Sequence, residues 1–368
     1  MDGFAAELEQ KVLRVRRWLA HQDTYEAVCL GHPINFAWIT GGGRNMVART
    51  SESGAAHVLV TRDDAVIVTS NIEAERISRE ENPFGLNVVA YDWWQGQGLQ
   101  RVIEQYVDSS RLVTDIAMPF GHLGPDALFM EFRRVLTEQE QMRARSLGRE
   151  AAEALEHALL DVRPEWSEQD LAWHVETALF RAAIDPAMVL VGGEERIYRY
   201  RHPVPTGAPV GALAMVAVGA RRAGLVMSLS RLISWGRPDE EVVRRLEATA
   251  GVLEAMVART VAGASYRAIW DSMDKTYRDF GYPDGWQGHH QGGLTGYRSR
   301  EWRLTPSLEG TVRPGELYAW NPSLPGAKAE HTLLVTPNGP EILTQGPVYV
   351  SSNPAWVAPN LVDVSALS

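Results

Sequence analysis

Hydrophobic and polar positions along the chain follow both helical and strand spacing, and this mixture predicts an α/β protein. Near the N-terminus, apolar residues in 5–20 recur at helical spacing with charged residues between them. Three short apolar runs with strand character follow at 25–30, 57–61 and 65–69, and the polar residues 62–64 join the last two. We therefore expect an amphipathic helix followed by a small sheet in the first part of the chain.

Longer elements dominate after about residue 126. A helical pattern runs with breaks to about residue 160, and Ser167 offers an N-cap for the next helix, with Asp170 three residues later. The further elements that we expect are an apolar hairpin at 212–219 and 225–229, a helix at 240–261, and strands near 315–320, 331–336 and 341–343.

The length of 368 residues favours two domains. We place their boundary at 135–145, which gives domains of residues 1–140 and 141–368. The apolar share of 45% and the charged share of 22% are ordinary for a globular protein. Lys and Arg number 36 and Asp and Glu 46, so the net charge of −10 disfavours nucleic acid or an anionic membrane as a partner.

The expected location is the cytoplasm. Cys29 is the only cysteine, so no internal disulfide and no thiolate metal cluster can form. Acidic residues near the N-terminus do not fit a signal peptide, and the longest apolar stretch, 210–220, is too short to span a bilayer.

Four segments in the second half carry chemistry and occur in a fixed order. They are Arg201-His202-Pro203, the hairpin from Met215-Val216-Ala217 to Ser228-Leu229-Ser230-Arg231, Gly288-His289-His290-Gln291-Gly292, and Trp320-Asn321-Pro322 followed by Lys328-Ala329-Glu330-His331. Their order resembles the creatinase/aminopeptidase P family. The resemblance implies a two-domain α/β architecture, with a creatinase-like N-terminal domain and a C-terminal catalytic domain of the pita-bread fold. It also implies a homodimer, because the N-terminal domain of such relatives commonly closes the partner's cleft.

The resemblance also implies five metal ligands, of which this chain keeps two. His289 and Glu330 match family ligands, whereas Ala217, Ser228 and Asn321 stand where the family has carboxylates. Carboxylates supply most of the charge that holds hard divalent cations, and a two-metal site needs bridging oxygens. We therefore expect neither a dinuclear centre nor any cofactor. Creatinase, a member of the family, cleaves a C–N bond without metal through a histidine near the start of its catalytic domain.

His202 occupies that region and is the first candidate for a general base. Imidazole titrates near neutral pH, so it can take a proton from water and return it to a leaving nitrogen. His289 and Glu330 complete the expected catalytic set, with Glu330 accepting hydrogen bonds from a cationic group. The alternatives are a structural role for His202 beside Pro203 and a packing role for His289.

The expected substrate-binding residues surround this set. Lys328 lies two positions from Glu330, so the two can pair on one strand face, although a plain salt bridge is the alternative. Arg300 belongs to a group of arginines that suits a carboxylate-bearing substrate, because the planar guanidinium can donate hydrogen bonds to two oxygens at once. The remaining members are Asn321, Trp320 and His290. Adjacent side chains on an extended segment point to opposite faces, so we expect only one of His289 and His290 in the pocket.

These residues predict a metal-independent enzyme that cleaves a C–N bond, by hydrolysis or elimination, in a small nitrogen-containing and carboxylate-bearing molecule. Specialised metabolism is one setting for such an enzyme. One alternative is a metal-dependent Xaa-Pro-type peptidase that binds a single ion through His289, Glu330 and a third ligand. The other alternative is a non-catalytic relative that binds a peptide or metabolite in the former active-site cleft.

Overall fold

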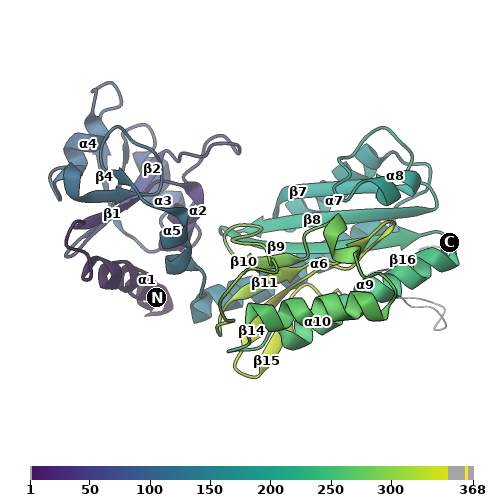
Figure 1. The fold of residues 1–368 in the computed structure, drawn as a ribbon. Helices are drawn as coiled ribbons and strands as arrows, with labels where there is room; N and C mark the ends of the chain where they lie inside the picture. The colour runs from purple at the N-terminus through teal and green to yellow at the C-terminus, as the bar shows by residue number, and fades with distance from the viewer. Residues whose placement is uncertain (1, 347–360, 364–368) are drawn as a thin grey trace. The chain divides into compact units, whose positions relative to one another are not determined.

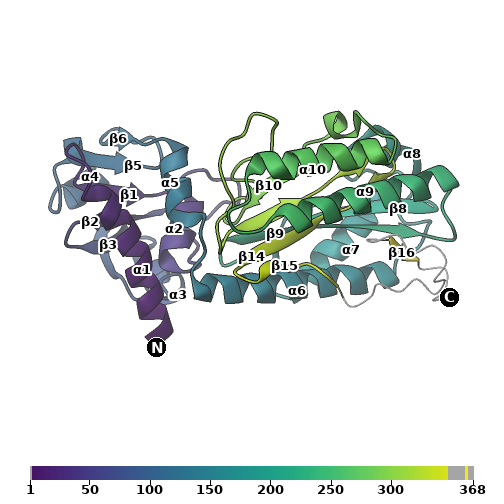
Figure 2. The same cartoon turned by 60° about the horizontal axis from the view of Figure 1, so that its bottom comes forward.

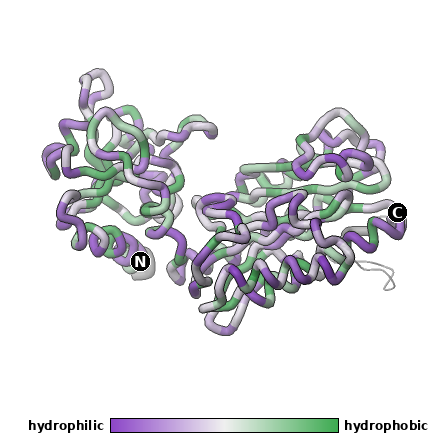
Figure 3. The backbone as a smooth tube through the Cα atoms, in the orientation of Figure 1, coloured by the Kyte–Doolittle hydropathy of each residue, from purple (hydrophilic) through white to green (hydrophobic). Residues whose placement is uncertain are grey.

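The computed structural model describes residues 2–346 and 361–363, and these residues divide into two compact units. The first unit contains residues 1–140 with 223–225, and the second contains 141–222 with 226–368. Hydrophobic segments follow the strands of both units, whereas the outer helices carry hydrophilic segments (Figure 3). No helix in the described part of the chain combines the length and apolar character that a membrane crossing requires.

The first unit is built around one mixed sheet of six strands in the order β4-β3-β2-β1-β5-β6 (Figure 1). Its strands are β1 (Ala27–Leu30), β2 (Ala56–Thr61), β3 (Ala65–Ser70), β4 (Asn87–Tyr91), β5 (Leu112–Thr114) and β6 (His122–Leu123). Its helices are α1 (Asp2–Leu19), α2 (Pro33–Thr40), α3 (Ala74–Glu80), α4 (Gly98–Ile103), η1 (Ser109–Arg111) and α5 (Asp126–Arg133). The three predicted strands are confirmed as β1, β2 and β3. Their apolar residues form strands here because almost all of them are buried.

The second unit contains two four-stranded sheets, in the orders β16-β9-β8-β7 and β10-β11-β14-β15, and a small two-stranded sheet. The strands of the first sheet are β7 (Asp185–Gly193), β8 (Leu213–Arg222), β9 (Leu225–Ser234) and β16 (Leu361–Asp363). Those of the other two are β10 (Gly292–Thr295), β11 (Leu317–Trp320), β12 (Ser323–Leu324), β13 (Ala327–Lys328), β14 (His331–Thr336) and β15 (Gly339–Ile342). The predicted strand at 331–336 is confirmed without change.

The helices of the second unit are α6 (Glu138–Leu160), α7 (Glu168–Arg181), α8 (Glu194–Arg199), α9 (Glu240–Arg259), α10 (Tyr266–Asp279) and the short η2 (Gly285–Gly288). The helices α9 and α10 pack side by side (Figure 2). The predicted capping box is confirmed: the Ser167 hydroxyl accepts from the Asp170 backbone, and the Asp170 carboxylate accepts from the Ser167 backbone. These contacts satisfy free N–H groups at the start of α7.

A two-residue turn joins β8 to β9, which are neighbours in the sheet. Its residues, Ala223 and Gly224, have φ values of 51° and 80°, and such a turn connects antiparallel strands. Counting outward from the turn places Ala217 opposite Ser230. The predicted hairpin therefore exists, but its strands end later than the apolar pattern indicated: the first ends at Arg222 and the second at Ser234.

Buried ion pairs fix the elements around this hairpin. The guanidinium of Arg231 on β9 lies 2.7 Å from Glu156 on α6, and both side chains are almost fully buried. Arg231 also donates to the Thr344 carbonyl at 2.8 Å. Breaking such a pair from one side leaves a buried charge without compensation, at a cost of about 3–5 kcal/mol. The hairpin that carries Ser228 and Ser230 is thus held firmly against its neighbours.

Candidate functional site

His202 and His289 meet at the centre of the candidate site. His202 is in the loop after α8 and is exposed, whereas His289 follows η2 and is only 8% exposed. The two Nε2 atoms are 3.1 Å apart, so one imidazole donates a hydrogen bond to the other. The structure therefore brings together the two histidines that the sequence proposed for catalysis.

His290 also belongs to this cluster, which corrects one expectation. The backbone of His289 is extended, with φ −162° and ψ 149°, yet the rings of His289 and His290 stack with centroids 4.4 Å apart. The prediction that only one of them enters the site is wrong. One ligand atom from each of His202, His289 and His290 lies within 4.8 Å of the others. Three neutral imidazoles at such distances are a donor set for a transition-metal ion.

Glutamine and tyrosine side chains hold the histidine segment in place, and the sequence analysis missed both. The Gln291 amide donates to the His289 carbonyl at 2.5 Å. Its oxygen accepts from the Tyr277 hydroxyl at 2.8 Å, and that hydroxyl in turn accepts from the Ser323 backbone N–H. The sequence did offer a signal for Gln291, which is a polar residue placed directly after the two histidines. Tyr277 belongs to α10, which was not predicted.

The glycines after Gln291 serve the fold. A Cβ at Gly292 would collide with the carbonyl oxygen of Ala319, and a Cβ at Gly293 with that of Trp302. Gly292 also has a φ of 109°, which side chains rarely permit. Both glycines therefore allow neighbouring chain segments to approach closely.

Glu330 accepts contacts from three side chains. Lys328 Nζ lies 3.0 Å from Oε2, Arg300 NH2 lies 3.0 Å from Oε1, and the Ser230 hydroxyl donates to Oε2 at 2.5 Å. The predicted pairing of Lys328 with Glu330 is confirmed. Ser230 was not predicted as a site residue, because its contact with Glu330 joins positions 100 residues apart.

The side chains at the three substituted family positions offer little to a cation. Ala217 has no donor atom, and the Ser228 hydroxyl accepts a hydrogen bond from Arg300 NH1 at 3.0 Å. Asn321 is 2% exposed, and within the described residues its Oδ1 has no hydrogen-bond partner. Its backbone N–H donates to the Gln291 carbonyl at 3.1 Å, which places it beside the histidine segment.

Trp320 is not part of the site, which is a second correction. The ring is fully buried, and its Nε1 donates to the Thr260 hydroxyl at the end of α9 at 2.9 Å. It stacks on Tyr318 with centroids 5.3 Å apart. The indole therefore packs in the core between β11 and α9. Its place beside Asn321 in the sequence suggested a substrate contact, but alternation along β11 turns the side chain away.

Positive charge dominates the electrostatics of the site. Burial first, and then Lys328, lowers the pKa of His289 to about 2. Burial, Arg300 and Arg303 lower the pKa of His290 to about 3, and burial and Lys328 also lower that of His202. All three imidazoles are therefore neutral at pH 7. Burial alone would raise the pKa of Glu330, but Lys328 and Arg300 outweigh it and lower the pKa to about 2. The carboxylate is ionised.

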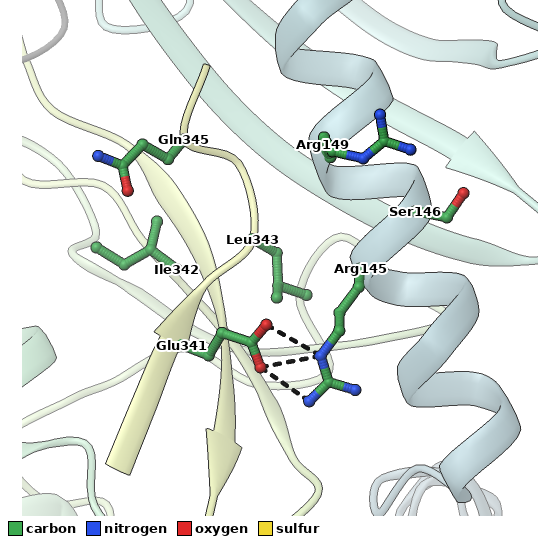
Figure 4. Close-up of a pocket in the computed structure, with 7 residues that line it drawn as sticks. All are labelled: Arg145, Ser146, Arg149, Glu341, Ile342, Leu343 and Gln345. Carbon is green, nitrogen blue, oxygen red and sulfur yellow. Dashed lines mark hydrogen bonds and ion pairs between the residues drawn. The ribbon is translucent and has the colours of Figure 1, made fainter. Parts of the chain in front are cut away.

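A separate depression of about 460 Å³ lies between α6 and β15 (Figure 4), and its lining residues do not include the three histidines of the candidate site. Arg145 and Glu341 form an ion pair across it, with Arg145 NH2 2.8 Å from the carboxylate. Arg149 at its rim pairs with Glu150 and Glu153 on the same helix. Each charged group that lines this depression already has a partner of opposite charge, so we assign the depression no ligand.

Comparison with known structures establishes the fold. A structure described as an Xaa-Pro dipeptidase from Bacillus anthracis matches at 18% identity and a TM-score of 0.79, over 97% of this chain and 99% of that one. A prolidase from Pyrococcus horikoshii OT3 matches at 19% identity and 0.78, over 91% and 98%. The N-terminal domain of FACT complex subunit SPT16 from Cicer arietinum (chickpea) matches at 12% and 0.69, over 98% of each chain. The fold is therefore the predicted two-domain creatinase-like architecture with a pita-bread domain.

A match to a family model covers a shorter part of the chain than the structural matches and agrees with them. Residues 142–337 match the model of metallopeptidase family M24, so the chain belongs to that family. No curated protein sequence matches it.

A two-metal centre of the kind that this family name implies does not fit the residues present. Of the five positions that the family resemblance assigns to metal ligands, only His289 and Glu330 have side chains that bind metals, and both oxygens of Glu330 are engaged by cationic side chains. No carboxylate is left to bridge two ions, because Ser228 and Asn321 are neutral. The site thus keeps the scaffold of the family with a different donor set.

Proposed function

We propose that this protein hydrolyses a C–N bond in a small, carboxylate-bearing molecule, with neutral His202 as general base and no dinuclear metal centre. The observation that best supports the proposal is the 3.1 Å contact between the Nε2 atoms of His202 and His289 beside the ionised Glu330. A neutral imidazole that is exposed on one side and hydrogen-bonded on the other can accept a proton from water.

For an amide substrate, the step balances as follows. His202 takes a proton from water while the water oxygen bonds to the carbonyl carbon. The C–N bond then breaks, the proton passes from the imidazolium to the leaving nitrogen, and the products are a carboxylic acid and an amine. The acid then gives its proton to the amine or to solvent, which leaves a carboxylate. Arg300 and Lys328 supply positive charge where the carbonyl oxygen becomes an oxyanion, a contribution that is large in sites that exclude water. His289 orients the base through their shared hydrogen bond.

The charges around the site favour an anionic substrate. Among the described residues, three cations, Arg300, Arg303 and Lys328, lower the pKa values of the histidines, and one anion, Glu330, opposes them. A substrate carboxylate would balance this excess of positive charge. A solved structure of the same fold is described as an Xaa-Pro dipeptidase, which favours a peptide-like amide as the substrate and gives no support to elimination.

The second candidate is a metal-dependent Xaa-Pro-type peptidase, and the comparisons favour it over the metal-free mechanism. The observation on its side is the cluster of His202, His289 and His290, which are spaced for a single ion. The positive charges of Lys328 and Arg300 oppose a cation at this place, because their effect on the histidines is already repulsive. We therefore rank it second.

A substrate panel distinguishes these candidates. Chelator-treated protein, its metal content verified by elemental analysis, is incubated with Xaa-Pro dipeptides, N-acyl amino acids and N-amidino amino acids, and products are identified by mass spectrometry. The proposal predicts cleavage of at least one class with incorporation of one oxygen from labelled water, and loss of cleavage in His202→Gln. Cleavage only after addition of metal would establish the second candidate. Binding without cleavage across the panel would refute both and identify a non-catalytic binding protein.

We further propose that the protein acts in the cytoplasm as a homodimer. The support is the single buried cysteine and the two-domain fold shared with prolidases.

A further inference from the structure

Arg300 joins two positions, Ser228 and Glu330, that the family resemblance assigns to metal ligands. Its NH1 donates to the Ser228 hydroxyl at 3.0 Å and its NH2 to Glu330 Oε1 at 3.0 Å. Ser228 lies on β9 and Glu330 lies directly before β14, so the planar guanidinium bridges two segments of the site. The side chain is only 9% exposed.

Lys328 occupies the other oxygen of the same carboxylate. Its ammonium lies 3.0 Å from Glu330 Oε2, and both side chains are 3% exposed. Two buried cations thus share one buried anion, and the surplus is one positive charge. Burying an unbalanced charge is expensive, so such a surplus persists where a ligand of opposite charge completes the site.

We propose that Arg300 and Lys328 form a built-in cation pair that takes the place of divalent cations at this site and excludes them. The pair holds Glu330 from both sides, so the carboxylate has no free oxygen for a metal ion. Its charge repels a cation that approaches His289. The exclusion of metal follows from the contacts alone. The inference rests on the proposed function only where it assigns the positive charge of the pair to the binding of an anionic substrate.

Buried polar atoms without a hydrogen-bond partner indicate which ligand the cation pair binds in place of a metal ion. Among the described residues, the buried Arg300 Nε has no acceptor and the buried Asn321 Oδ1 has no donor. A buried donor or acceptor that is left without a hydrogen bond costs about 1–3 kcal/mol. A ligand that carries an oxyanion together with an N–H group would satisfy both. A carboxylate-bearing amide, or the tetrahedral oxyanion formed from it, has this combination.

Metal binding by charge-removing variants tests the exclusion without any substrate. Isothermal titration with Mn²⁺ and with Zn²⁺ at pH 7.5 compares the wild-type protein with Lys328→Met, Arg300→Met and the double variant. We expect weak binding by the wild-type protein and at least tenfold tighter binding by the double variant, because Glu330 is released to act with His289. Arg303→Met is the matched control, since it removes an equal charge without a contact to Glu330, and we expect a change below threefold.

Tight, stoichiometric binding of either ion by the wild-type protein would overturn the inference. So would a double variant that binds no better than the wild-type protein. Lys328→Gln keeps a hydrogen-bond donor toward Glu330 and replaces the double variant in the titration if the double variant does not fold. The inference requires that Lys328→Gln also binds the metal ion more tightly than the wild-type protein, and unchanged affinity would contradict it. A wild-type protein that excludes metal but cleaves nothing in the substrate panel would refute the proposed function and leave this inference intact.

Discussion

His202 and His289 are 87 residues apart in the chain, yet their Nε2 atoms form a 3.1 Å hydrogen bond. Because a neutral imidazole has one N–H and one lone pair, one ring must donate and the other must accept. Which ring donates depends on the tautomers of the two imidazoles. The two histidines proposed from the sequence are therefore coupled, because a change in the protonation of one ring changes the hydrogen bond to the other.

The first prediction concerns the base. His202→Gln keeps a side chain that can hydrogen-bond to His289 but cannot carry a proton at neutral pH. A general base contributes about 10²–10⁴-fold to the rate, so kcat should fall by that order while the melting temperature changes little. Steady-state kinetics on the substrate identified by the panel measure this. A kcat within threefold of the wild-type value, together with an inactive His289→Gln, would show that His289 is the base.

The second prediction concerns the pH dependence of activity. Burial and the charge of Lys328 lower the pKa of His202 below its ordinary value of 6.5. The base form is therefore retained as the pH falls through the range in which a free histidine becomes protonated. We expect kcat/KM to stay level from pH 8 to pH 6.5 and to decline only at lower pH. A decline centred at or above 6.5 would show that an unperturbed or raised group controls the rate.

Acid stability provides a third prediction. Burial lowers the pKa of His289 to about 2, whereas the unfolded chain has the ordinary value of 6.5. As the pH falls below 6.5, the unfolded state binds a proton that the folded state does not, so stability decreases. Between pH 7.5 and pH 5.5 this group removes about 1.4 kcal/mol. Urea unfolding of wild-type and His289→Gln protein should differ by that amount in their pH dependence. Identical pH dependence in both would contradict the burial of a neutral His289.

Local patterns predicted the parts of the fold that depend on neighbouring residues. The capping box of Ser167 and Asp170 and the strand at 331–336 were both correct, because hydrogen bonds within one turn and a continuous apolar run are sufficient to specify them. The long strand β7 was missed because several of its positions are partly exposed polar or small residues. Its stability comes from pairing with β8, which no local pattern reveals.

The candidate site shows the same division. Spacing along the chain predicted that Lys328 and Glu330 pair, and the structure confirms it. The contacts of Ser230 with Glu330 and of Arg300 with Ser228 join distant segments, so only the assembled fold shows them. Trp320 failed as a site residue because its orientation is set by packing against α9.

Association between copies is the fourth prediction. The two-domain relatives whose architecture this chain shares lead us to expect a homodimer. Light scattering coupled to size-exclusion chromatography should give a mass near twice the 40.8 kDa of one chain at working concentration. A mass of one chain over the whole accessible concentration range would refute the expectation.

The most direct test of the central claim is the activity of protein from which metal has been removed. Elemental analysis first establishes that zinc, manganese, iron and cobalt are far below one equivalent per chain, and kcat/KM is then measured before and after each metal is added back. The account predicts full activity in the metal-depleted protein and no gain from any added ion, because Arg300 and Lys328 supply the positive charge. Activity that disappears with the metal and returns in proportion to the ion bound would contradict it.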